Sequence, residues 1–126
     1  MARQTFHTDS AHRPPGFSPA TRVGNMVFVS GQVGLGKDGK LTGPDAGAQS
    51  AQCFRNIEAA LKAAGATLDD VTKITTFLVN AEDYPAFAAE RLKVFPENGP
   101  ASSTVIVRAL VRPEYLVEVE AVAVVG

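Results

Sequence analysis

The last predicted strand of this chain carries apolar side chains on both of its faces. Residues 115–124 read YLVEVEAVAV, and side chains alternate between the two faces of a strand. One face carries Val117, Val119, Ala121 and Ala123, and the other carries Leu116, Val122 and Val124. A sheet that is apolar on both faces must be covered on both. Any fold that contains this strand must therefore supply two covering layers.

Five strands and two helices are predicted along the chain, in the order β-β-α-β-α-β-β. Residues 11–20 hold three prolines and a glycine, and they predict a loop because proline cannot donate to a β-ladder. Elsewhere, β-branched and aromatic runs predict strands, and apolar residues at helical spacing predict helices. The strands are expected at residues 3–7, 27–30, 70–80, 102–110 and 115–124, the first helix at 46–64 and the second after Asp83.

Capping residues mark both predicted helices. Asp45 is placed to cap the first helix, and Gly65 lies where a left-handed glycine commonly ends one. Asp83 is placed to cap the second helix, with Pro85 in its first turn. Two helices can cover only one face of a sheet, so the second apolar face predicts burial against another subunit.

Length and charge limit the classes of function. The 126 residues predict a single domain over residues 1–126. The net charge is −1, which argues against a nucleic-acid partner because polyanion binding needs an excess of cations. A single cysteine allows no internal disulfide, and no apolar run approaches the ~20 residues of a membrane span. The N-terminus lacks an apolar leader core. We therefore expect a cytoplasmic protein with no membrane partner.

No motif for a metal, a phosphate or a nucleophile stands out. His7 and His12 are not at ligand spacing, and the glycines within residues 34–39 predict a turn because no Lys-Ser/Thr pair follows them. Cys53 falls in the first predicted helix, where we interpret it as a core residue rather than a nucleophile. The sequence therefore predicts no metal and no cofactor.

Two carboxylates interrupt the second apolar face of the last strand. Glu118 and Glu120 lie there between Leu116 and Val122. A carboxylate on an apolar face is costly unless it is paired or has a function. One interpretation is a buried ion pair that joins subunits. The other is an acid that positions water or moves a proton.

Three segments carry a resemblance to a known family. Residues 27–32 read VFVSGQ, residues 100–104 read PASST and residues 116–123 read LVEVEAVA. Together they resemble the RidA/YjgF family of imine deaminase-like proteins, which are also labelled endoribonuclease L-PSP. The resemblance implies a chorismate mutase-like/YjgF fold of the α+β class, with a mixed β-sheet of about six strands and two α-helices packed on one face. It also implies a homotrimer with a central β-barrel and three clefts between subunits.

The residue that holds the substrate in this family is absent. Deaminating members typically read Pro-Ala-Arg-Ser in the middle segment, and that arginine grips the substrate's carboxylate. Ser102 takes its place here and cannot form a bidentate, charge-assisted clamp, so ordinary imines of 2-oxo acids should bind poorly. In this family the segment near the C-terminus reads Glu-Ile/Val-Glu-Ala, and its first glutamate positions the hydrolytic water. That glutamate corresponds to Glu118. The resemblance favours a catalytic role for Glu118 and a structural one for Glu120.

Other substrate-binding positions of the cleft are partly kept. Ser30 and Gly31 match the family, and Thr104 stands where the family has cysteine or threonine. Phe17 keeps the ring of a family tyrosine without its hydroxyl. Ala88 replaces an asparagine that often faces the site.

Arg91 is a candidate for the missing cation. It falls near the middle of the apolar stripe on the second predicted helix. One interpretation is a guanidinium that reaches solvent or pairs with a glutamate across the interface. The other is a relocated anion clamp near Ala88. Arg108 is a second candidate, because it would share strand parity with Ser102.

These observations predict a cleft for a small, carboxylate-bearing molecule and leave three functions open. The first is hydrolysis of an enamine or imine of altered substrate class. The second is a non-catalytic trimer that binds or senses a metabolite. The third is endoribonuclease or translation-inhibitor activity, which is weakened by the near-neutral charge and the absence of a catalytic histidine pair.

Overall fold

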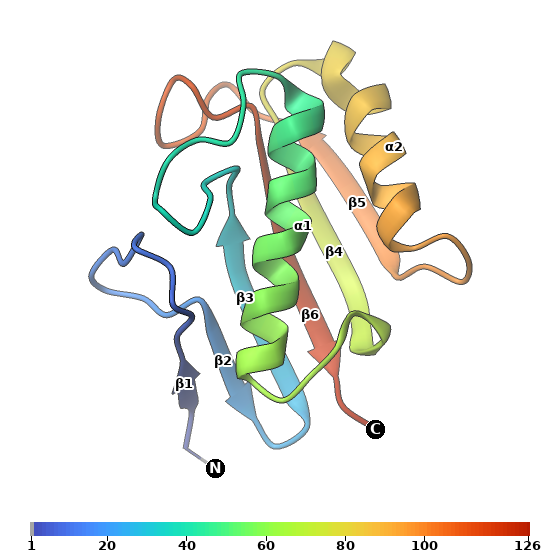
Figure 1. Cartoon of the computed structure of the whole chain (residues 1–126). Coiled ribbons are helices and arrows are strands. Elements are labelled where there is room, and N and C mark those ends of the chain that lie inside the picture. Colours follow the sequence, from blue (N-terminus) through green and yellow to red (C-terminus); the bar gives the residue numbers. More distant parts are fainter. Residues whose placement is uncertain (1) are drawn as a thin grey trace.

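One mixed sheet of six strands, with two α-helices on one of its faces, makes up the computed structural model, which describes residues 2–126 (Figure 1). The architecture is α+β, as the family resemblance implies. The elements are β1 (Gln4–Phe6), β2 (Ala20–Val23), β3 (Met26–Gln32), α1 (Ala46–Ala63), β4 (Val71–Leu78), α2 (Tyr84–Val94), β5 (Ala101–Ile106) and β6 (Val117–Val124). Short 3-10 turns at Leu68–Asp70 and Ala81–Asp83 precede β4 and α2.

The strands lie in the order β1-β2-β3-β6-β4-β5, so the last strand of the chain is central and β1 and β5 are the edges. Every neighbouring pair is antiparallel except β4 and β5, which are parallel. A parallel pair needs a crossover connection, and α2 supplies it. This topology places β6 between β3 and β4. Because both faces of β6 carry apolar side chains, both faces of the sheet must be covered.

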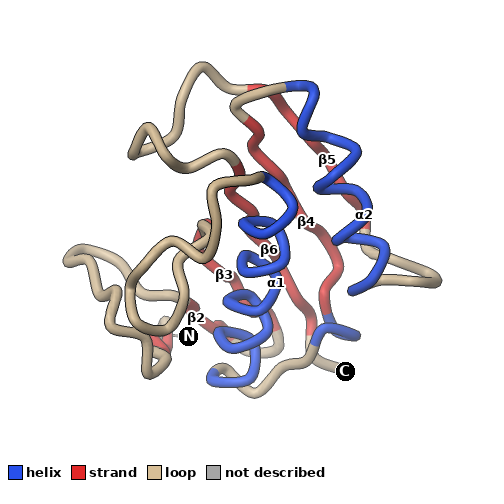
Figure 2. The backbone as a smooth tube through the Cα atoms, turned by 45° about the horizontal axis from the view of Figure 1, so that its top comes forward, coloured by secondary structure: helices blue, strands red, loops and turns tan. Residues whose placement is uncertain are grey.

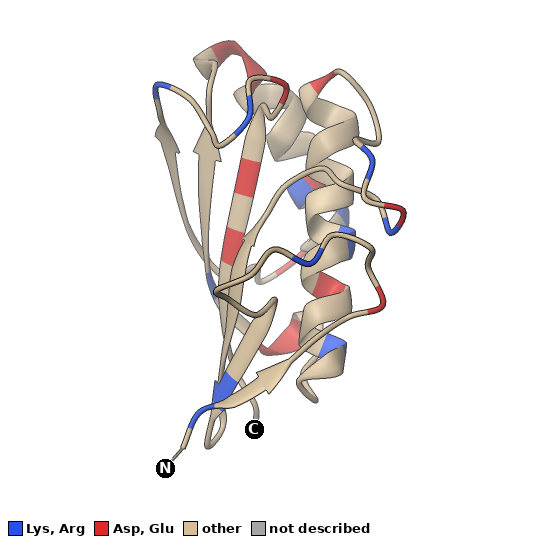
Figure 3. Cartoon of the chain, turned by 90° about the vertical axis from the view of Figure 1, so that its left-hand side faces the viewer, with Lys and Arg blue, Asp and Glu red and all other residues tan. Residues whose placement is uncertain are grey.

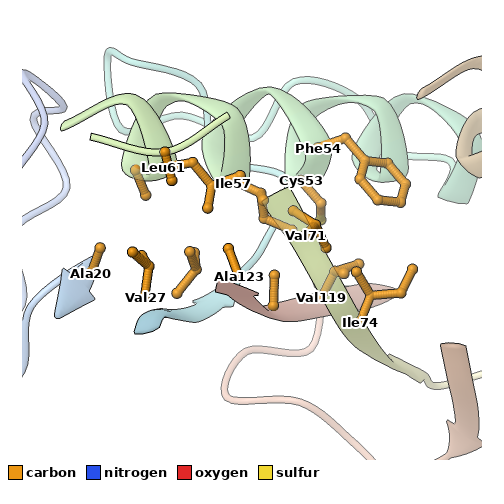
Figure 4. Packing of buried hydrophobic residues seen from close by; sticks show 14 of the residues in the cluster. Ala20, Val27, Cys53, Phe54, Ile57, Leu61, Val71, Ile74, Val119 and Ala123 are labelled. Carbon is orange, nitrogen blue, oxygen red and sulfur yellow. The ribbon is translucent and has the colours of Figure 1, made fainter. Parts of the chain in front are cut away.

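The core lies between α1 and the sheet (Figure 4). Residues at helical spacing on α1 point toward the strands: Cys53, Phe54, Ile57 and Leu61 pack over Val27, Val119 and Ala123. Burial of each large apolar side chain contributes roughly 1.5–3 kcal/mol. Both predicted caps of α1 are confirmed. The Asp45 carboxylate accepts a hydrogen bond from the Ala48 N–H at 2.7 Å, and Gly65 has a φ of +81°.

Strand β2 is absent from the sequence prediction, which assigned residues 11–20 to a loop and placed no strand between residues 21 and 26. The segment Ala20–Val23 (ATRV) is only four residues long and has polar residues at its centre, so no alternation stands out. It forms a hairpin with β3, and Gly24 supplies the positive φ of the turn, 59°. The sheet thus reaches six strands.

Strand β5 is shorter than predicted, and this removes Arg108 from it. Residues 102–110 were expected to form the strand, but it covers Ala101–Ile106. Its only neighbour, β4, ends at Leu78, and the last backbone bond of the pair is donated by Val107 to the Leu78 carbonyl at 2.8 Å. Arg108 lies beyond this point in a loop, so it does not share strand parity with Ser102.

Asp83 does not cap α2, contrary to the sequence prediction. The 3-10 turn at Ala81–Asp83 runs directly into the helix, so Asp83 already has helical backbone angles, with φ −83° and ψ −6°. Its side chain makes no capping hydrogen bond. A capping residue needs extended backbone angles to aim its oxygen at the first helical N–H groups, and the preceding turn denies this to Asp83.

Both helices cover the same face of the sheet, and no other element within residues 2–126 covers the opposite face (Figures 2 and 3). That open face is nevertheless rich in apolar side chains, with Met26, Phe28 and Val124 each 37–42% exposed. No helix in the described part of the chain has the length and apolar character that crossing a membrane requires. The open face therefore needs another cover.

Candidate functional site

Glu118 lies in β6, paired with Phe77 of β4, on the open face of the sheet. It is half-buried, and Glu120, which shares the face, is exposed. Burial raises the pKa of the Glu118 carboxyl above its ordinary value, and the charge of Glu120 raises it further. Within residues 2–126 neither glutamate forms an ion pair. A half-buried carboxyl of raised pKa without a cation is a group that can exchange protons.

Gly31 holds the backbone of β3 against this carboxylate. A β-bulge interrupts the pairing of β3 with β6 between Val29 and Gln32. A Cβ atom at residue 31 would lie 2.8 Å from Cδ and 3.1 Å from Cγ of Glu118. The bulge thus brings the backbone of β3 close to a side chain of β6, and Glu118 is the group that it approaches.

Ser30 fastens the proline-rich loop to β3. Its hydroxyl donates to the Ser18 carbonyl at 2.6 Å, and its N–H donates to the Pro19 carbonyl at 2.9 Å. Phe17, next to this anchor, is 56% exposed, so its ring stands free of the chain's own core. The structure thus places Phe17, Ser30 and Gly31 near one another.

A cavity of about 640 Å³ opens between this loop, strands β1 to β3 and α1. Phe17, Ser30 and Gly31 line it. Four cationic or titratable side chains that were not predicted as site residues also line it: Arg3, His7, His12 and Arg13. Their spacing carries no motif, because they meet only where the proline-rich loop folds back over β1.

Ser102 and Thr104 lie on β5 and face the helices. They pair with Ile74 and Thr76 of β4, whose side chains are buried under the helical layer. Ser102 is exposed because β5 is an edge strand, and Thr104 is half-buried. These two residues are therefore on the opposite face of the sheet from Glu118.

Arg91 reaches from α2 to the serine that replaces the family arginine. Its Nη1 donates to Ser102 Oγ at 3.2 Å, and its Nη2 donates to the Tyr84 hydroxyl at 2.8 Å. The guanidinium carbon lies 5.3 Å from the centre of the Phe87 ring and 5.5 Å from that of Tyr84. Ala88, on the same helix, is half-buried.

Tyr84 and Phe87 were not singled out as site residues from the sequence. The available signal was their spacing, since residues four and seven positions before Arg91 share a face of the helix with it.

The candidate residues thus form two groups that do not meet within one chain. One group contains Glu118, Gly31 and Ser30, and the other contains Ser102 and Arg91. Strand β4 separates β6 from β5, and the two groups face opposite sides of the sheet. A site that uses both groups must join two copies of the chain.

Cys53 takes no part in either group. Its side chain is fully buried, and its thiol lies 3.8 Å from the Val117 carbonyl. Burial raises the pKa of the thiol, and the charge of Glu118 adds to this effect. The structure thus agrees with its interpretation as a core residue. Among residues 2–126 no three His, Cys, Asp or Glu side chains gather as a metal site would require.

Comparisons with known proteins agree with the resemblance carried by the motifs. The family model described as Endoribonuclease L-PSP matches residues 10–125. The 2-iminobutanoate/2-iminopropanoate deaminase of Dermatophagoides farinae is 35% identical over 126 residues, covering 98% of this chain and 97% of that protein. The 3-aminoacrylate deaminase RutC of Acinetobacter baylyi is 38% identical over 108 residues, 85% of each chain. The crystal structure of RidA from the Antarctic bacterium Psychrobacter sp. has a TM-score of 0.89 at 35% identity, covering 97% of this chain and 99% of that one.

Proposed function

Because the chain belongs to the RidA/YjgF family, we propose that it hydrolyses the enamine or imine of a small metabolite in a cleft between subunits. The observation that carries this proposal is the state of Glu118. Its half-buried carboxyl has a raised pKa, lies against Gly31 and has no cation beside it within residues 2–126. Two relatives named for deaminating an imine and an aminoacrylate support the reaction class.

In the proposed reaction Glu118 handles the protons of a hydrolysis. The carboxylate takes a proton from water as the water oxygen bonds to the imine carbon, and the proton then passes to the nitrogen. The hydroxyl proton of this adduct is then transferred through the carboxylate to the nitrogen as the C–N bond breaks, so the products are a carbonyl compound and ammonia. An enamine substrate first takes a proton on carbon and releases one from nitrogen to become the imine. A raised pKa moves the titration of Glu118 closer to neutral pH. General acid–base catalysis is most efficient when the pKa of the catalytic group lies near the working pH. Water is the only co-reactant in this reaction.

The same proposal includes a homotrimer with a central β-barrel. The open sheet face is apolar and uncovered, and an oligomer would bury it. Closure of three sheets into a barrel would also bring the Glu118 group of one subunit toward the Ser102 group of the next. This arrangement would give the carboxylate-bearing ligand a complete cleft, which one chain lacks.

Turnover of imines generated in situ from amino acids by an amino-acid oxidase tests the reaction. Trapping of the remaining imine with semicarbazide measures how fast the protein removes it. Glu118→Gln keeps the shape of the side chain and should lower turnover by ~100-fold or more. Glu120→Gln is the matched control on the same face and should change little, and light scattering should show the same assembly for all three proteins.

Absence of any acceleration by the wild-type protein across a panel of amino acids would contradict hydrolysis. Ligand binding without turnover would favour the alternative of a metabolite-binding trimer. Full activity in Glu118→Gln would remove Glu118 from the mechanism.

A further inference from the structure

Three hydrogen-bond donors converge where α2 meets the start of β5. The Arg91 guanidinium donates to the hydroxyls of Ser102 and Tyr84, which therefore act as acceptors toward it. A hydroxyl that accepts from a cation still has its own hydrogen to donate. Both hydroxyls can thus donate to an anion that also contacts the guanidinium. One cation and two hydroxyls form a constellation suited to a carboxylate.

The positive charge of Arg91 has no counter-charge beside it in the part of the chain that the structure describes. Within residues 2–126 no carboxylate lies at ion-pair distance from its guanidinium. Two aromatic faces, those of Phe87 and Tyr84, and the two hydroxyls fix its position. A guanidinium has five N–H donors, so donors remain for a bidentate contact after both hydroxyls are served. This is a held cation rather than one that extends into bulk solvent.

We propose that Arg91 holds the carboxylate of the substrate, and that Ser102 and Tyr84 orient it. This inference rests on the proposed function and adds the substrate class to it. In the family the cation belongs to the strand position that Ser102 occupies. Here the cation comes from the helix and lies beside that same position, so the anion contact is moved rather than lost.

The move also changes the distance that the substrate must span. Arg91 Nη1 lies 3.2 Å from Ser102 Oγ, close to the strand. An arginine at position 102 would instead carry its guanidinium several bonds beyond the γ atom. The relocated cation is therefore set back from the reacting carbon. It selects enamines and imines whose carboxylate is further from the C–N carbon than in 2-iminopropanoate.

Stable oxo acids test this inference without any turnover. Pyruvate carries its carboxylate next to the carbonyl, and acetoacetate carries it one carbon further away. Calorimetric titration should show tighter binding of acetoacetate than of pyruvate to the wild-type protein. Arg91→Met should weaken acetoacetate binding by roughly 30-fold or more. Arg108→Met is the matched control, since it removes an arginine from the adjoining loop, and it should leave the affinity unchanged.

Two further variants keep the inference open to contradiction if Arg91→Met fails to fold. Arg91→Lys keeps the charge but loses the planar fork, and it should weaken acetoacetate binding at least several-fold. The double variant Arg91→Met/Ser102→Arg returns the guanidinium to the strand and should reverse the preference in favour of pyruvate.

Equal acetoacetate affinity in wild type and Arg91→Met would overturn the inference, as would failure of the wild-type protein to bind either oxo acid. If the double variant still bound acetoacetate more tightly than pyruvate, the claim that Arg91 lies further from the reacting carbon than an arginine at position 102 would be refuted. These binding results do not depend on imine hydrolysis. A protein that binds acetoacetate through Arg91 but hydrolyses nothing would contradict the proposed function alone.

Discussion

The carboxylate of Glu118 lies against Gly31 so closely that a Cβ atom on residue 31 would stand 2.8 Å from the carboxyl carbon. The atoms in the way belong to the end of a flexible side chain, which can rotate aside. Gly31→Ala should therefore change the free energy of unfolding by only about 0.5 kcal/mol, as at most surface sites, while it displaces the carboxylate and lowers imine turnover. Chemical denaturation and the turnover assay measure the two effects. Non-additivity with Glu118→Gln would confirm that the residues act through each other.

Gly34→Ala is the control for this substitution. A Cβ at residue 34 would lie 2.9 Å from the Cα atom of Gln49, a backbone atom of α1 that cannot rotate aside. This variant should lose about 1–3 kcal/mol of stability, as overpacked cores do. A similar loss in Gly31→Ala would mean that Glu118 is fixed rather than free to move.

The pH dependence of stability should reveal the burial of Glu118. Its pKa in the folded protein is raised above the ordinary 4.5, so the folded state holds this proton more tightly than the unfolded state does. The group therefore lowers stability progressively as pH rises from that value through the folded pKa. Glu118→Gln removes this loss, so it should be more stable than wild type at about pH 7 but not at about pH 4. Thermal unfolding of both proteins at the two pH values measures this. An equal stability difference between wild type and Glu118→Gln at both pH values would contradict the raised pKa of Glu118.

A charge on the open sheet face should separate the subunits. Phe28 lies on that face and is 42% exposed. Phe28→Asp should dissociate the assembly and lower thermal stability together, because obligate oligomers often lack a stable monomer. Val111→Asp is the control, since Val111 is 89% exposed in a loop. A wild-type protein that is monomeric at micromolar concentration by light scattering would exclude the trimer outright.

Substrates of the 2-aminoacrylate type should be turned over slowly. Loss of a charged partner for a desolvated carboxylate can cost about 2–5 kcal/mol, which corresponds to roughly 30-fold to several-thousand-fold in rate. The comparison is with a family member that has the Pro-Ala-Arg-Ser segment, assayed side by side. Matching rates would show that the clamp at position 102 is dispensable for such small substrates.

Much of the fold can be predicted from local sequence patterns. The caps of α1 at Asp45 and Gly65 and the alternation of β6 follow from rules that act over a few residues, and the structure confirms them. Strand β2 and the early end of β5 depend instead on partners. Ala20–Val23 becomes a strand because β3 pairs with it, and β5 stops where β4 ends. No local pattern contains that information.

The candidate site divides in the same way. Strand alternation places Glu118 and Glu120 on one face, and helical spacing places Arg91 on the same side of α2 as Tyr84 and Phe87. The contact between Arg91 and Ser102 is different in kind. It joins α2 to β5, the strand that follows it, and it depends on how the connection between them folds, which no local sequence pattern predicts.

The burial of Cys53 turns the chain's one thiol into a built-in reporter of its core. Cys53 has no exposed surface, and it lies between α1 and the central strand β6. A thiol-reactive dye can reach it only when α1 lifts from the sheet, so the labelling rate measures how often the core opens. Because the cysteine is unique, any label reports on this one event. The labelling rate of Cys53 thus measures how often the core opens, and no engineered residue is needed.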